Sequence, residues 1–156
     1  MVIKEQVPAV VSPYPNSFAG LMEMYESNYM QLQLLLTNIR QLPDLQVVAV
    51  EGRVPVLLQV RERSQHTTTL LMTYCFTGGQ GAGNDTRPDM LVRVYHDALQ
   101  AEVISHRCRL SDRLFRYQDA DPDSMLRCRW RMNRFLFKWV GYLRRQGYRF
   151  HLQDGL

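Results

Sequence analysis

The sequence predicts a single α+β domain, in which a five-stranded antiparallel meander carries an N-terminal and a C-terminal helix on one face. Two observations favour this fold class. In the segments 17–42 and 125–146, apolar residues recur every three or four positions, which is typical of amphipathic helices. From position 45 the period changes to two and Val, Leu and Thr become common, which indicates strands.

The chain length suits one domain. Its 156 residues are of ordinary domain size, and an apolar content of 46% is enough for a core. Residues 1–16 contain three prolines and show no period, so we expect an extended or disordered arm there. The domain should cover 17–150, and 151–156 should form a tail.

Ser17 is a suitable N-cap for the first helix, because its hydroxyl can accept a hydrogen bond from a free N–H of the first turn. The apolar stripe continues until Leu42 and Pro43 stop the helix. Its members are Phe18, Leu21, Met22, Tyr25, Tyr29, Leu32, Leu35, Leu36 and Ile39. Such a stripe is ordinarily a core face, and a ligand-lined groove is the alternative.

Five strands are expected between the helices. Three of them cover 45–50, 54–61 and 67–76, and a hairpin over 90–106, reversing at 97–100, supplies two more. Pro55 cannot donate a ladder hydrogen bond, so its strand should begin at an edge or a bulge. The glycine-rich segment 77–89 is not followed by a helix, so we interpret it as a solvated connection and not a phosphate-binding loop. Residues 107–124 should form irregular turns.

The last helix should be capped by Asp123 or Ser124 and ended by Gly147. Its apolar side consists of Phe135, Trp139, Met132, Leu143, Leu136, Val140 and Leu126. The opposite side forms a basic ridge, which consists of Arg127, Arg131, Arg134, Lys138 and Arg145.

Charge is segregated along the chain. Residues 126–151 contain eight basic residues and no acid, so they carry +8; since the whole chain carries +4, the remainder carries −4. Ordinary surface helices mix both signs. Two interpretations of the basic ridge stay open. It is neutralised by another part of the protein, or it binds an external acidic partner, either a protein or a nucleic acid.

The hairpin holds the densest set of reactive side chains, which are Tyr95, His96, Asp97 and Glu102. They suggest a small hydrolase or nucleotide-binding enzyme with His96 as general base and Asp97 orienting it. The structural alternative is that Asp97 closes the turn, His96 is half-buried beside it, and Glu102 pairs with a cross-strand neighbour. No further ligands complete a metal site. We therefore favour a non-enzymatic binding or regulatory module without a cofactor.

Compartment and assembly can also be predicted. Cys75, Cys108 and Cys128 lack zinc-site or disulfide-framework spacing, so we expect reduced thiols and a cytoplasmic location. No stretch approaches the roughly 18 apolar residues of a membrane span, and no convincing signal peptide opens the sequence. Trp130 and Phe137 fall between the apolar and basic sides of the last helix, where exposed aromatics would suit a homodimer interface.

The hairpin and the last helix resemble the YqiB-like family of small bacterial proteins, a domain of unknown function. The matching residues are Met90, Val92, Arg93, Tyr95, His96, Asp97, Ala98, Ala101, Glu102, Val103, Tyr117, Asn133, Phe135, Leu136, Trp139, Leu143 and Gly147. The resemblance covers most of 20–147 and implies a cytoplasmic bacterial protein, but no established activity, cofactor or partner. Arg127-Cys128-Arg129 departs from the acidic, mixed-charge helix start expected of the family, which makes the Tyr-His-Asp run the better shared site.

Overall fold

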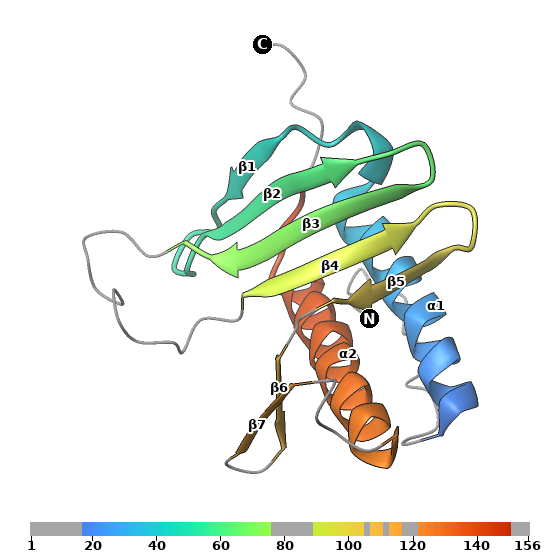
Figure 1. Cartoon of the computed structure of the whole chain (residues 1–156). Helices are drawn as coiled ribbons and strands as arrows, with labels where there is room; N and C mark the ends of the chain where they lie inside the picture. The colour runs from blue at the N-terminus through green and yellow to red at the C-terminus, as the bar shows by residue number, and fades with distance from the viewer. Residues whose placement is uncertain (1–16, 76–88, 105–106, 111–112, 117–121, 151–156) are drawn as a thin grey trace, which may run out of the picture.

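The computed structural model describes residues 17–75, 89–104, 107–110, 113–116 and 122–150 (Figure 1). The elements follow one another along the chain as α1 (Phe18–Leu36), the 3-10 helix η1 (Ile39–Gln41), β1 (Leu45–Val48), β2 (Val56–Arg63), β3 (Thr67–Tyr74), β4 (Met90–Tyr95), β5 (Gln100–Val103), β6 (Arg107–Leu110), β7 (Arg113–Arg116) and α2 (Pro122–Arg145). The predicted arm 1–16, the glycine-rich connection up to residue 88 and the tail 151–156 lie outside the described residues.

Strands β1 to β5 form one antiparallel sheet in chain order, so the predicted α+β meander is confirmed. Helices α1 and α2 lie side by side on one face of this sheet (Figure 1). Burial alternates along the strands as the pleat requires: in β4, Met90, Val92 and Val94 are buried and their neighbours are half-buried. The buried set packs against both helices and forms the main core.

Helix α1 begins as predicted and ends earlier. The Ser17 hydroxyl accepts a hydrogen bond from the N–H of Gly20 at 2.8 Å. The helix stops at Leu36 because Thr37 takes a positive φ of 59°, and only the short η1 continues toward Leu42. The Thr37 hydroxyl donates to the Phe150 carbonyl at 3.1 Å, so this break also holds the end of the described chain.

Helix α2 begins at Pro122, before the predicted caps, so Asp123 and Ser124 lie within its first turn. Proline suits that position because the first N–H groups of a helix have no intrahelical acceptor. At the other end Gly147, with φ of +92°, reverses the chain as predicted. Tyr148 and Phe150 then enter the core, where both are almost fully buried.

Two predictions are wrong, one about the segment 107–124 and one about the state of the cysteines. The range 107–124 was expected to form irregular turns, but it contains the antiparallel pair β6–β7 and the start of α2. The cysteines were expected to be reduced; Cys75 is free, but Cys128 is disulfide-bonded. The thiol argument for a cytoplasmic location therefore no longer holds.

The assignment of aromatic residues to the two sides of α2 also needs correction. Trp130 is only 3% exposed, because it packs with Leu21, Met24 and Tyr25 of α1, and Phe137 lies against the same cluster. Conversely Phe135, predicted to face the core, is 46% exposed. Trp130 is thus not available for the dimer surface predicted from it, and Phe137 is partly covered.

One edge of the sheet is closed by a side chain. Asn133 is fully buried on α2, and its Oδ1 accepts a hydrogen bond from the β5 N–H of Val103 at 2.9 Å. Its Nδ2 donates to the Arg129 carbonyl at 2.8 Å, and its own carbonyl accepts from Nδ2 of Asn28 at 3.1 Å. This contact satisfies a donor at the β5 edge and fixes both helices against that edge.

Candidate functional site

The hairpin between β4 and β5 places Tyr95 and Glu102 on the sheet face away from the helices. Tyr95 lies opposite Gln100 and Arg93 lies opposite Glu102, so Tyr95 and Glu102 are diagonal neighbours. The Tyr95 hydroxyl donates to Oε1 of Glu102 at 2.6 Å. Burial, followed by this hydrogen bond, raises the pKa of Tyr95 above its ordinary value of 10.0.

Glu102 also reaches the two helices at the edge of the sheet. Its Oε2 lies 3.8 Å from Nη1 of Arg129 on α2, and its side chain is only 18% exposed. Burial and then the Glu102 charge raise the pKa of Tyr25, on α1, to about 12. The Glu102 carboxylate therefore lies between Tyr95 and Arg129, and both tyrosines remain protonated.

His96 points the other way, into the core. Its Nε2 lies 2.7 Å from the Thr68 hydroxyl, and its backbone N–H donates to the His66 carbonyl at 2.9 Å. Burial lowers the pKa of His96 below 6.5, and the charge of Arg40 lowers it further. The imidazole is thus held neutral and shielded from solvent.

Asp97 occupies the exposed turn and pairs outside the predicted set. One carboxylate oxygen lies 2.5 Å from Nδ1 of His66, and the other lies 3.7 Å from Nη2 of Arg40. Asp97 therefore orients His66 rather than His96, and these contacts do not support the general-base arrangement. Sequence reasoning missed both partners of Asp97, which are Arg40 and His66. The only available signal was the place of His66 in the turn before β3.

The four predicted hairpin residues thus share one hairpin but face three surroundings: the outer sheet face, the core and the solvent. Among the residues that the structure describes, no three His, Cys, Asp or Glu side chains gather into a possible metal site. Three pockets lined by described residues lie at α1 and the β4–β5 turn, at β1 and β2, and across β2 to β4, and none of the four side chains lines any of these three. The hairpin side chains are therefore well connected to their neighbours but do not converge on one point.

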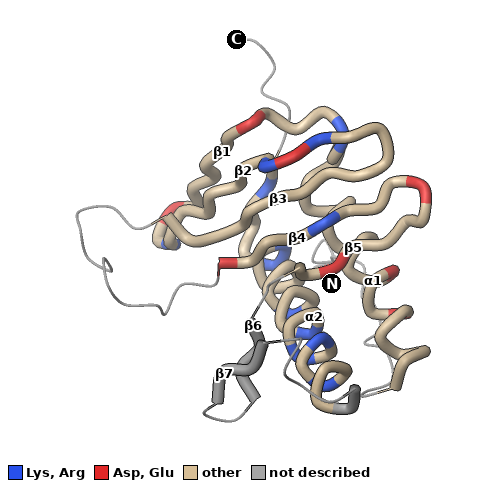
Figure 2. The backbone as a smooth tube through the Cα atoms, viewed as in Figure 1, with Lys and Arg blue, Asp and Glu red and all other residues tan. Residues whose placement is uncertain are grey.

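The basic ridge, by contrast, is one continuous exposed surface. All five members are exposed along α2, and Figure 2 shows the basic positions of this helix gathered below the sheet. The ion pairs within the described residues are Arg40–Asp97, Arg63–Asp44, His66–Asp97 and Arg129–Glu102. None of them includes a ridge member, so the described acids do not neutralise the ridge.

Two aromatic side chains lie beside the ridge, and sequence reasoning missed both. Phe135 and Tyr142 are 46% and 38% exposed, and their spacing of seven residues puts them on the same side of α2 as Arg131 and Lys138. The ring of Phe135 is tilted against Trp139, with centroids 6.2 Å apart. At 100° per residue Phe135 falls at the end of the apolar side that is nearest to Arg131, and this position is the signal that could have found it.

The comparisons with known proteins give a family without an activity. No curated protein and no solved structure matches the chain. None of the described helices is long and apolar enough to cross a membrane. The YqiB-like resemblance is not itself named by the family match and stays a prediction. Residues 31–149 match the family model for a protein of unknown function, DUF1249, and the chain belongs to that family.

Proposed function

We propose that this protein is a non-enzymatic module that binds a nucleic acid through the exposed face of α2. The observation that carries the proposal is the basic ridge without an acidic partner among the described residues. A cytoplasmic, bacterial setting, as implied by the YqiB-like resemblance, belongs to the same proposal.

The arrangement of the charges favours a polyanion over a single acidic group. Arg127 and Arg145 are separated by 18 positions on one helix, which corresponds to about 27 Å at a rise of 1.5 Å per residue. A line of one sign over that length suits repeated phosphates. Like charges three or four residues apart repel by a few tenths of a kcal/mol each, and a bound polyanion would relieve this repulsion.

The exposed aromatics favour a single strand over a duplex. Phe135 and Tyr142 flank Lys138 on the exposed side of α2, about 10 Å apart along the axis. Proteins that bind single strands combine a basic track with aromatic rings on which bases stack. A duplex keeps its bases stacked internally, so these rings would gain nothing from it.

Fluorescence anisotropy with labelled single-stranded DNA, single-stranded RNA and duplex DNA tests the proposal across a salt series. We expect single strands to bind more tightly, with log K falling against log salt at a slope of about −3.5 if the five cations contact phosphates. Replacing Arg131, Arg134 and Lys138 together by Glu should abolish binding. The double variant Phe135→Ala and Tyr142→Ala should lower the affinity for single strands but not the affinity for duplex DNA.

The matched control is a single reversal elsewhere. Arg61→Glu alters an exposed arginine of β2, outside the ridge, and should leave affinity within about twofold, whereas Arg134→Glu should weaken it clearly. Salt-independent binding, or equal effects of the two reversals, would contradict the proposal and leave an acidic protein as the partner. The alternative enzyme centred on Tyr95, His96, Asp97 and Glu102 has no comparable observation in its favour, because those side chains do not converge.

A further inference from the structure

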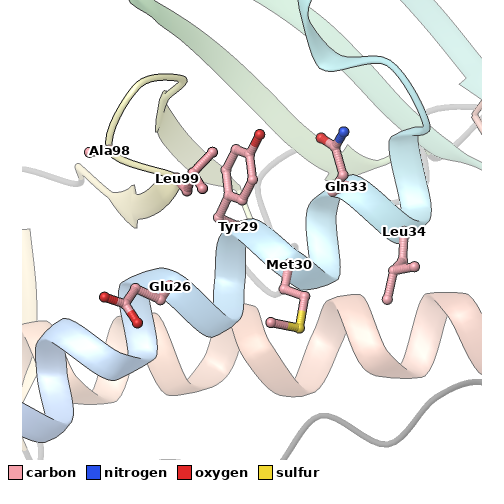
Figure 3. Close-up of a pocket in the computed structure, with 7 residues that line it drawn as sticks. All are labelled: Glu26, Tyr29, Met30, Gln33, Leu34, Ala98 and Leu99. Carbon is pink, nitrogen blue, oxygen red and sulfur yellow. The ribbon is translucent and has the colours of Figure 1, made fainter.

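A second surface, whose lining residues include no ridge member, is an apolar groove between α1 and the turn that joins β4 to β5. Figure 3 shows Leu99 of the turn next to Tyr29 of α1, with Met30 and Leu34 farther along the helix and Glu26 before them; all five line the groove. The groove encloses about 520 Å³. Such a volume is within the range of binding sites.

Leu99 is unfavourable for folding in two ways at once. Its φ of 55° lies in the left-handed region, which glycine and asparagine adopt more readily than leucine. Its side chain is nevertheless 55% exposed, so no burial offsets the strain. An outlier of this kind, at a place where apolar surface is presented to water, points to binding rather than to stability.

Helix α1 adds matching apolar surface on the other side. Met30 and Leu34 are four residues apart, so they lie on the same face one turn apart, and both are about half exposed. Methionine is flexible and polarisable, which suits the recognition of apolar side chains of varied shape. The groove therefore presents three large exposed aliphatic side chains from two elements.

The charge of the rim limits the kind of partner. Glu26 is the one charged side chain among the residues that line the groove, and the exposed Glu23 lies three positions before it on α1. An acidic rim repels phosphates, so neither a nucleic acid nor an anionic lipid surface suits this groove. It complements an apolar segment that carries a basic residue.

We infer that the groove binds a short peptide segment of another protein, with two or three large apolar side chains and a lysine or arginine placed against Glu26. From Glu26 to Leu34 the groove follows α1 over nine residues, which are eight steps of 1.5 Å or about 12 Å. This length accommodates two turns of an amphipathic helix, whose apolar residues recur at three- and four-residue spacing.

A displayed library of random short peptides, selected on the intact protein and counter-selected on Leu99→Asp, tests this inference. We expect enriched peptides to combine spaced apolar residues with Lys or Arg. For a synthetic copy of one such peptide, Leu99→Asp and Met30→Asp should each weaken binding at least about tenfold. Glu26→Lys should weaken it too, and a peptide with its basic residue changed to Glu should recover affinity for that variant.

Two further variants guard against effects on folding. Leu45→Asp changes a leucine of similar exposure on β1, away from the groove, and should leave the peptide affinity unchanged. Leu99→Gly should raise the melting temperature, by about 2–4 °C, because glycine accepts the positive φ, and yet lose peptide binding. Loss of binding together with gain of stability is not expected from a merely structural leucine.

Three results would overturn the inference: no enrichment of apolar, basic peptides; peptide binding that is indifferent to Leu99 and Met30; or self-association in sedimentation that Leu99→Asp removes, which would assign the groove to a second copy of the chain. Nucleic-acid binding by the basic ridge should be unaffected by Leu99→Asp. The two proposals can therefore fail separately.

Discussion

Glu102 joins four elements with one carboxylate. It lies on β5 and contacts Tyr95 of β4 and Arg129 of α2, while its charge raises the pKa of Tyr25 of α1. The sequence alone suggested a cross-strand partner, and Arg93 does lie directly opposite. The helix partners could not be predicted, because they depend on how α1 and α2 pack at the sheet edge and not on local spacing.

His96 gives a prediction about pH. Its pKa is lowered from 6.5 by burial and by the charges of Arg40 and His66, while Asp97 acts in the opposite direction. Below about pH 6.5 the unfolded chain takes up a proton that folded His96 resists, so the stability of the wild-type protein should fall as the pH drops from about 6.5 to the folded pKa. One such proton contributes at most about 1.4 kcal/mol per pH unit.

Replacing His96 by Gln removes this titration and leaves a side chain that can still reach Thr68. Urea unfolding between about pH 8 and pH 5 should therefore show a weaker pH dependence in His96→Gln than in the wild type. His66→Gln, which changes an exposed histidine of the neighbouring turn between β2 and β3, is the matched control. An unchanged pH dependence in His96→Gln would contradict the neutral, buried state of His96.

At the scale of elements, hydrophobic period predicted which segments are helices and strands, but not which neighbour covers each side of a helix. Aromatic residues flank the apolar stripe of α2 on both sides, and the hydrophobic period does not distinguish one flank from the other. Because α1 packs against one of them, Trp130 is buried, while Phe135 on the other remains exposed. The break at Thr37 was missed for a related reason, since it depends on a hydrogen bond to the distant Phe150.

Asn133 offers a test of how α2 is fixed to the sheet. In Asn133→Ala the Val103 N–H loses its acceptor at a buried position, so the free energy of unfolding should fall by about 1–3 kcal/mol. Urea unfolding with an unchanged m value would measure it. Asn38→Ala, at an exposed position, should stay within about 0.5 kcal/mol. Equal effects of the two changes would show that the buried contact contributes little.

For the whole molecule, the meander was predictable because short connections place successive strands beside each other, which fits the observed order. The pair β6–β7 was not predicted, since each strand is only four residues long and rich in arginine, which is too short for a two-residue period to stand out. The separation of charge was also readable from sequence. The positions of the charges in space were not readable: the ridge lies on a helix face that no described acid pairs with, and the apolar groove with Glu26 on its rim lies between α1 and the hairpin turn.

This separation predicts how salt acts on the free protein. Raising the salt concentration from about 50 mM to about 200 mM screens the repulsion among Arg127, Arg131, Arg134 and Lys138, so the melting temperature should rise. A few tenths of a kcal/mol for each neighbouring pair amount to about 1 kcal/mol, or about 2–4 °C in a chain of this size. Arg134→Glu turns its contacts with Arg131 and Lys138 into attractive pairs, so this variant should melt higher at low salt and lose stability as salt is added.

Arg61→Glu should keep the wild-type trend. Calorimetry at fixed pH measures all three proteins, and a wild-type melting temperature that falls with salt would show that the ridge is neutralised within the protein itself, leaving no free charge for a nucleic acid.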